Sequence, residues 1–90
     1  MKNKKIIDLR KKIDKIDRKL FNLLEKRLDL CKKIAKEKIK NNFKIKDSKR
    51  EKNLIKDKIR NFNLRKEFIN KIYKIIFDES KNLQKNEKIL

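Results

Sequence analysis

The stretch IIDLRKKIDKIDRKLFNLLEKRLDLCKKI, residues 6–34, decides the fold of this 90-residue chain. Apolar residues recur in it at alternating spacings of three and four, which is typical of a helix with one apolar face. The stripe consists of Ile6, Leu9, Ile13, Ile16, Leu20, Leu23, Arg27, Leu30 and Ile34. All of these are aliphatic except Arg27. A charge on a buried stripe is costly unless an opposite charge meets it, so Arg27 indicates either a buried carboxylate partner or a site for an anion.

The composition of the whole chain is typical of a helical protein. It has no glycine and no proline, which favours long helices joined by short loops. We therefore predict an all-α fold in a single domain, residues 1–90, with helices over about 4–39, 47–61 and 65–86. Ser48 and Glu51 would form a capping box at the start of the second helix, or Asp47 would cap it instead.

The length of the first helix predicts a dimer. About 36 helical residues span ~54 Å, which exceeds the diameter of a 90-residue globule. Part of this helix would have nothing to pack on in a single chain. The simplest solution is a symmetric homodimer in which the long helices of two chains pair in a helical bundle.

The charge of the chain is strongly basic. It has 31 Lys and Arg residues against 13 Asp and Glu, a net charge of +18. Most of the basic residues are lysines spread along the chain, which indicates a compositional bias on solvated faces more than a nucleic-acid site. Only weak, non-specific binding to nucleic acid is expected from it. Such a surface should also cost stability through self-repulsion, so we expect a marginally stable dimer that salt helps.

The sequence also bears on the location of the protein. No apolar run approaches the ~18–20 residues of a membrane span, and the basic N-terminus lacks the apolar segment of a secretory signal. Cys31 is the only cysteine, so it forms no internal disulfide. A cytoplasmic protein is the default expectation.

A few polar residues fall on faces that should be buried. They are Lys38 on the face of Arg27, Glu51 on the apolar stripe of the second helix, and Ser80 and Gln84 on that of the third. Each has an ordinary explanation: a solvated helix end, a partner for the helix dipole, or a helix that leaves the core. Together they favour a pocket for a small polar anion. The absence of histidine excludes a histidine triad or a histidine metal site, and one cysteine makes zinc unlikely.

The order and spacing of these residues resemble the all-helical chorismate mutases of the bacterial type. The resemblance covers about residues 5–87, with a shorter segment between the second and third helices. Successive members of the set are 17, 11, 9, 4, 29 and 4 residues apart. The set consists of Arg10, Arg27, Lys38, Asp47, Glu51, Ser80 and Gln84, with Arg50 beside it.

The resemblance implies an isomerase that rearranges chorismate to prephenate, an early step toward phenylalanine and tyrosine. This Claisen rearrangement needs no covalent intermediate, metal or cofactor. The enzyme must hold a dicarboxylate in a compact conformation and direct donors at the ether oxygen, where negative charge grows.

The resemblance also implies roles for the basic residues and the amide. Arg10 and Arg27 would bind carboxylates, with a geometry that favours arginine over lysine. Lys38 would donate to the ether oxygen and to a carboxylate, and Gln84 would be the second donor to the ether oxygen. We therefore expect Arg27, Lys38 and Gln84 to be the catalytic residues.

The remaining members of the set would hold the substrate. Glu51 and the backbone of Asp47 would bind the ring hydroxyl, Ser80 would contact the ring carboxylate, and Arg50 would orient its acidic neighbours. Helical rise places Arg10 about 42 Å from Lys38 along one helix, so one small ligand cannot touch both in a single chain. Arg10 must then come from the other subunit, as in the intertwined dimer of the family.

Two other functions stay open. Related helical proteins cleave isochorismate to pyruvate and salicylate in a similar pocket, although Glu51 and Ser80 favour the mutase. The second alternative is a basic helical module that binds RNA or DNA. Members of the resembled family are often fused to prephenate dehydratase or dehydrogenase, and this sequence fits a free enzyme or part of such a fusion.

Overall fold

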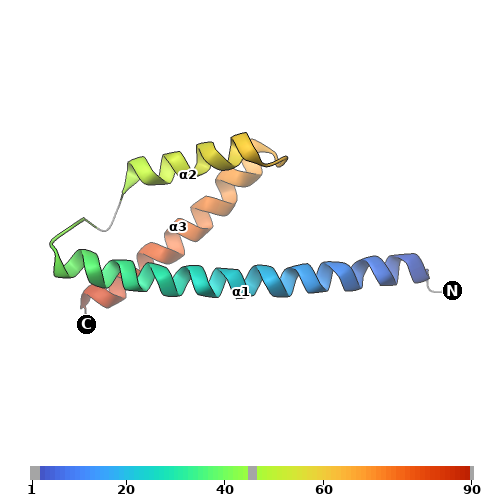
Figure 1. The fold of residues 1–90 in the computed structure, drawn as a ribbon, viewed down its shortest axis with the longest axis horizontal. Coiled ribbons are helices and arrows are strands. Elements are labelled where there is room, and N and C mark those ends of the chain that lie inside the picture. The colour runs from blue at the N-terminus through green and yellow to red at the C-terminus, as the bar shows by residue number, and fades with distance from the viewer. Residues whose placement is uncertain (1–2, 45–46, 90) are drawn as a thin grey trace. The chain divides into compact units, whose positions relative to one another are not determined.

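The computed structural model describes residues 3–44 and 47–89, with side chains as far as Lys85. Within these residues it contains three helices and no strand: α1, Lys4–Lys40; α2, Ser48–Asn61; and α3, Lys66–Ile89 (Figure 1). The predicted all-α class, with one helix much longer than the others, is confirmed. No helix of the described residues is both long and apolar enough to span a membrane.

The chain divides into two compact units, Met1–Leu30 and Cys31–Leu90. The first unit consists mainly of the N-terminal part of α1. Asn3 caps this helix, because its side-chain oxygen accepts hydrogen bonds from the backbone N–H groups of Lys5 (3.0 Å) and Ile6 (3.3 Å). This cap satisfies two of the donors that every helix N-terminus leaves without a partner inside the helix.

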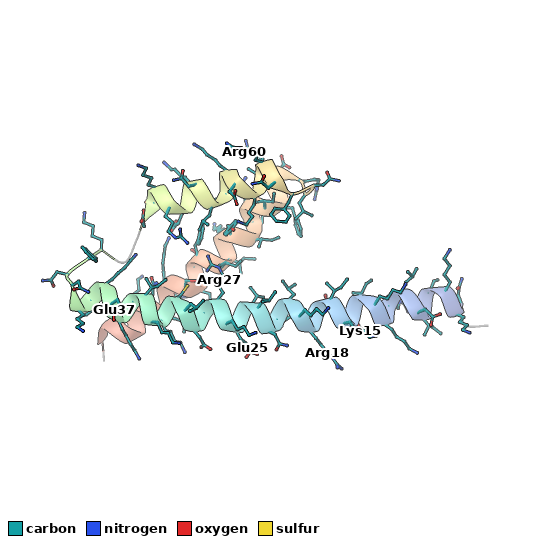
Figure 2. The ribbon with its side chains drawn as sticks, in the orientation of Figure 1. Lys15, Arg18, Glu25, Arg27, Glu37 and Arg60 are labelled. Carbon is teal, nitrogen blue, oxygen red and sulfur yellow. The ribbon has the colours of Figure 1, made fainter. Side chains whose placement is uncertain are left out.

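The apolar stripe of the first unit is exposed. Its exposed fractions range from 45% at Ile6 to 62% at Ile16. As expected for part of this helix in a single chain, the stripe has nothing to pack on, because this unit is one helix and offers no second surface. Burial of the stripe against another chain stays a prediction. Side chains leave this part of α1 on opposite sides, with Arg18 and Glu25 on one side and Arg27 on the other (Figure 2).

The second unit has a small core built on α3. Ile69 and Tyr73 are buried on the face of α3 that meets α2, and Ala35, near the end of α1, is fully buried. Tyr73 also stacks on Phe77, with ring centroids 5.0 Å apart. Ile69, Tyr73 and Phe77 follow one another at a spacing of four residues, about one turn of α3, as a single helix face requires.

A second apolar face of α3 is exposed. Phe68, Ile72 and Ile75 are 46%, 36% and 71% exposed. Phe62, just beyond the last residue of α2, is 55% exposed. The apolar residues of α3 thus extend around more of its circumference than α2 alone can cover.

The end of α1 is closed by an asparagine. Asn42 adopts a positive φ of 61°, a left-handed conformation that asparagine tolerates better than most residues in a chain without glycine. The N–H of Phe43 then donates to the carbonyl of Lys38 at 2.7 Å, and the N–H of Asn42 donates to Ile39 at 3.3 Å. This pair of bonds is the Schellman motif, and it fixes the backbone of the last turn, which carries Lys38.

Candidate active site

The second unit contains six of the eight residues that the sequence predicted for the site. They are Lys38, Asp47, Arg50, Glu51, Ser80 and Gln84. The other two, Arg10 and Arg27, belong to the first unit, where Arg10 is exposed and Arg27 is half-buried. The structure thus places six of the eight predicted residues in one compact unit.

Gln84 is a buried polar side chain of this set. It is 7% exposed, and its Nε2 donates to the backbone carbonyl of Cys31 at 3.3 Å. This bond joins the C-terminal part of α3 to the segment of α1 that lies in the same unit. An amide nitrogen carries two N–H groups, and the bond to Cys31 uses one of them.

Ser80 lies one turn before Gln84 on the same face of α3. It is also 7% exposed, and its hydroxyl donates to the carbonyl of Ile76 at 2.8 Å. The buried face of α3 is therefore apolar at Ile69 and Tyr73 and polar at Ser80 and Gln84. The helix does not leave the core where this face becomes polar, so these two groups are available at the edge of the core.

Asp47 begins α2, which decides between the two predicted caps. Its side-chain oxygen accepts a hydrogen bond from the N–H of Arg50 at 3.0 Å, so Asp47 and not Ser48 is the N-cap residue. Glu51 follows in the first turn of the helix. Two carboxylates thus sit at the positive end of the α2 dipole, where a negative charge is stabilised.

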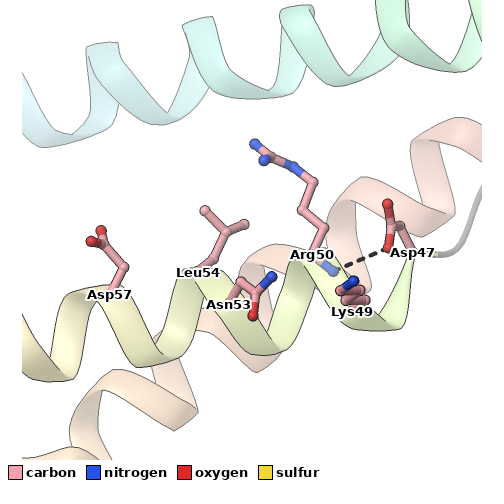
Figure 3. Close-up of a pocket in the computed structure, with 6 residues that line it drawn as sticks. All are labelled: Asp47, Lys49, Arg50, Asn53, Leu54 and Asp57. Carbon is pink, nitrogen blue, oxygen red and sulfur yellow. Dashed lines mark hydrogen bonds between the residues drawn. The ribbon is translucent and has the colours of Figure 1, made fainter.

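An open pocket of about 360 Å³ lies along this part of α2 (Figure 3). Arg50 and Leu54 extend from one side of the helix, and Asp47 lies at its start. The pocket is lined by Asp47, Lys49, Arg50, Asn53, Leu54 and Asp57. Both signs of charge therefore line it.

Glu51 is half-buried and forms an ion pair that the sequence did not predict. Its Oε2 lies 3.3 Å from Nζ of Lys81, and the two side chains are 23% and 28% exposed, respectively. The pair connects α2 to α3 and lines a second pocket of about 360 Å³ between these helices, to which Phe77 and Asp78 also contribute. Lys81 thus enters the candidate site, next to Ser80 in the chain.

The sequence contained only a weak signal for Lys81. It follows Ser80 directly and precedes Gln84 by three residues. Residues three apart are neighbours on a helix surface, so this spacing places Lys81 beside Gln84. The chain has so many lysines on exposed faces that this spacing alone could not distinguish Lys81 from the others. Only the packing of α2 against α3 shows that its ammonium group meets Glu51.

Lys38 is half-buried in the last turn of α1, within the second unit. Its backbone carbonyl is fixed by the N–H of Phe43. Ala35 precedes it by three residues and is fully buried, so this side of α1 is closely packed where Lys38 extends from it. Gln84 donates to the backbone carbonyl of Cys31, which lies on α1 one turn before Ala35.

The electrostatics of α2 show one clear perturbation. A hydrogen bond from the Lys58 ammonium, 2.9 Å away, and its charge hold the pKa of Asp57 below the ordinary carboxyl value. The same bond raises the pKa of Lys58, and the phenol of Tyr73 raises it further. This pair lies toward the other end of α2 from Asp47 and Glu51 and stabilises the charged forms of both partners.

This chain is similar to known proteins along most of its length. Residues 9–85 match the family model described as chorismate mutase type II. The chain is 37% identical over 86 residues to a bifunctional chorismate mutase/prephenate dehydratase of Buchnera aphidicola subsp. Acyrthosiphon pisum, which covers 92% of this chain. It is 38% identical over 84 residues to the protein of the same description from Buchnera aphidicola subsp. Schizaphis graminum. The chain spans 22% of the length of each of these bifunctional relatives.

A relative of similar size is also found. The chain is 38% identical over 85 residues to a chorismate mutase of Methanocaldococcus jannaschii, with 90% of this chain and 85% of that protein covered. The matched family region contains every residue of the predicted site, from Arg10 to Gln84. The chain belongs to the chorismate mutase type II family.

Proposed function

We propose that this chain rearranges chorismate to prephenate, as the catalytic mutase unit of a homodimer. The observation that carries the proposal is the buried amide of Gln84, which is held by the Cys31 carbonyl and lies one turn from the buried hydroxyl of Ser80. A polar pair of this kind at the edge of a small apolar core is costly to bury unless it serves a ligand or a structural bond. The bond to Cys31 uses one N–H of the amide, and the other is proposed to donate to the ligand.

The proposed chemistry depends on orientation and electrostatics. In the rearrangement the C–O bond of the ether breaks as a C–C bond forms, and negative charge grows on the ether oxygen. Lys38 and the second N–H of Gln84 are proposed to donate to this oxygen, which stabilises the transition state more than the substrate. Arg27 is proposed to hold a carboxylate of the substrate in the compact reactive conformation.

The groups on α2 and α3 are proposed to select the ring. Glu51, half-buried, would accept a hydrogen bond from the ring hydroxyl, together with the backbone at Asp47. Arg50 would orient these acidic neighbours. Ser80 would donate to the ring carboxylate, for which its O–H must turn away from the carbonyl of Ile76, to which it now donates. Each of these roles remains a proposal that comes from the family resemblance.

The exposed stripe on α1 supports the dimer. Aliphatic side chains that are about half-exposed follow one another along the N-terminal part of this helix, from Ile6 to Leu23. Contiguous apolar surface of this extent marks an interaction site in most proteins. A second copy of the helix offers the matching stripe, because a two-fold interface uses the same surface on both chains. The cytoplasmic location expected from the sequence remains part of this proposal.

The direct test is turnover of chorismate. Purified protein is incubated with chorismate, and the loss of its ultraviolet absorbance is followed together with phenylpyruvate released by acid treatment. Phenylpyruvate in proportion to the chorismate consumed supports the mutase. A folded protein that leaves chorismate unchanged would refute it. Pyruvate and salicylate formed from isochorismate, with no phenylpyruvate from chorismate, would identify the lyase instead.

Mixed dimers test whether Arg10 comes from the other subunit. Arg10→Ala and Gln84→Ala are each expected to be inactive alone. After the two variants are mixed, unfolded and refolded together, half of the dimers should be mixed, and each of these should have one intact site. The mixture should therefore recover about a quarter of the wild-type activity. No recovery, in a mixture shown to contain mixed dimers, would place Arg10 and Gln84 of the same chain in one site.

A further inference from the structure

Lys81 takes part in the candidate site through a contact that no feature of the sequence singled out. Its Nζ lies 3.3 Å from Oε2 of Glu51, and both side chains are more than two-thirds covered. Exposed ion pairs contribute little to stability, about 0–1 kcal/mol, because water screens them and two long side chains lose freedom. A pair that is mostly covered and joins two helices is better placed to fix the geometry of its members.

The bond constrains the carboxylate of Glu51 in a specific way. A glutamate side chain has three rotatable bonds, so a carboxylate without a partner occupies several orientations. The ammonium of Lys81 contacts Oε2, which leaves Oε1 to accept a hydrogen bond from a ligand hydroxyl. Lys81 also stands between Ser80 and Gln84 on α3, so the helix that presents these two buried groups also sets the position of Glu51.

We propose that Lys81 is a positioning residue, which holds the Glu51 carboxylate so that one oxygen faces the ring hydroxyl of the substrate. The proposal rests on the proposed function, because it assigns Lys81 a role only through the hydroxyl that Glu51 binds. It predicts that Lys81 acts on binding and orientation through Glu51, without contact between its ammonium and the reacting atoms. It also predicts that arginine, which can make the same ion pair, replaces it better than an uncharged side chain of similar length.

The test compares Lys81→Met with Lys81→Arg and with a matched control. Lys71→Met removes the same charge from an exposed position of α3 outside the pockets described above. We expect Lys81→Met to lower kcat/KM about tenfold, mainly through KM, since a hydrogen bond to a charged group is lost or misdirected. Lys81→Arg and Lys71→Met should each stay within about threefold of wild type. An equal loss in Lys81→Met and Lys71→Met would show a general effect of charge and overturn the proposal.

A double-mutant cycle separates positioning from direct contact with the substrate. If Lys81 acts through Glu51, Lys81→Met should change kcat/KM less than about twofold in a Glu51→Gln background. If the tenfold loss persists in that background, Lys81 contacts the substrate itself, and the positioning role is wrong.

The wild-type protein, Lys81→Met, Glu51→Gln and the double variant also give a second cycle, which does not depend on turnover. Their unfolding by urea, measured without chorismate, should show coupling between Glu51 and Lys81, because the ion pair exists in the free protein. Additive effects on unfolding would overturn the proposal even in an active enzyme. A third outcome is coupling between Glu51 and Lys81 on unfolding, together with no conversion of chorismate by the wild-type protein. This outcome would show that the ion pair exists, but that the proposed function and the role it gives to Lys81 are wrong.

Discussion

Gln84 and Cys31 are 53 residues apart in the chain, yet the side chain of one donates to the backbone carbonyl of the other at 3.3 Å. The bond ties the C-terminal part of α3 to α1 within the second unit, and it orients an amide that is 7% exposed. Under the proposed function, stability and catalysis would depend on the same side chain. A variant of Gln84 should lose both, in proportions that can be measured separately.

Gln84→Ala should lower kcat for chorismate by about 10²–10³-fold, since one of two donors to the developing charge is lost. Unfolding by urea should become easier by about 1 kcal/mol, because the bond to Cys31 is lost as well. Gln84→Leu fills the same volume without donors and controls for the cavity. A Gln84→Leu protein with near wild-type turnover would show that the amide is structural only.

Ser80→Ala should have a smaller effect on turnover, roughly three- to tenfold in kcat/KM. The Ser80 hydroxyl proton already bonds to the carbonyl of Ile76, 2.8 Å away, so a substrate carboxylate gains it only at the cost of that bond. Ser80→Cys, which keeps a weaker donor of similar size, is the matched control and should lie between alanine and wild type. Steady-state kinetics with chorismate measure both. A loss from Ser80→Ala that equals the loss from Gln84→Ala would contradict this order.

Asp47→Ala should destabilise the protein by about 1 kcal/mol, because α2 loses the carboxylate that accepts from the N–H of Arg50. Asp47→Ser keeps a good capping oxygen and should recover most of the loss. Because the proposed contact of Asp47 with the ring hydroxyl uses its backbone, Asp47→Ser should also keep most of the activity. Urea unfolding and chorismate turnover of both variants check this. An Asp47→Ala protein as stable as wild type would show that another group caps α2.

The sequence predicted the helices well because their signals are local. The three-and-four spacing and the capping residues at Asp47 and Ser48 specify backbone geometry within a few residues. The helix ends that the structure shows lie within three residues of those expected. The inward direction of Ser80 and Gln84 was also predictable, since each continues a stripe of apolar residues at a spacing of four on one helix.

Other features could not be predicted because they depend on contacts between distant segments. The stripe from Ile6 to Leu23 has the pattern of buried residues, and the length of the helix predicted that one chain leaves part of it uncovered, but the pattern does not specify the surface that covers it. The pairing of Glu51 with Lys81 depends on how α2 packs on α3. The bond from Gln84 to a backbone carbonyl left no sequence signal at all, since any residue can provide a carbonyl group.

Lys58→Met should raise the pKa of Asp57 toward the ordinary carboxyl value. The hydrogen bond from Lys58 is the largest cause of the lowered pKa, followed by its charge, while Asn61 and Arg60 contribute less. A lowered pKa in the folded state stabilises the protein above the unfolded pKa, and this contribution is lost as the pH falls through the folded pKa. Because Asp57 is exposed, its pKa is best measured directly, by following the titration of its side-chain carboxyl by NMR. Lys56→Met, an exposed neighbour on α2, is the control and should leave most of the shift in place.

Because of the net charge of +18, added salt should stabilise the folded protein. Cations that repel one another across the surface oppose the folded state, and salt screens this repulsion with a Debye length of about 10 Å at 0.1 M. We expect the melting temperature, followed by circular dichroism, to rise between low and moderate concentrations of sodium chloride. Lys56→Glu combined with Lys71→Glu lowers the net charge at two exposed positions, so its melting temperature should depend less on salt. A wild-type protein that melts at a higher temperature in low salt than in high salt would show that attractive ion pairs, such as that of Glu51 with Lys81, outweigh the repulsion.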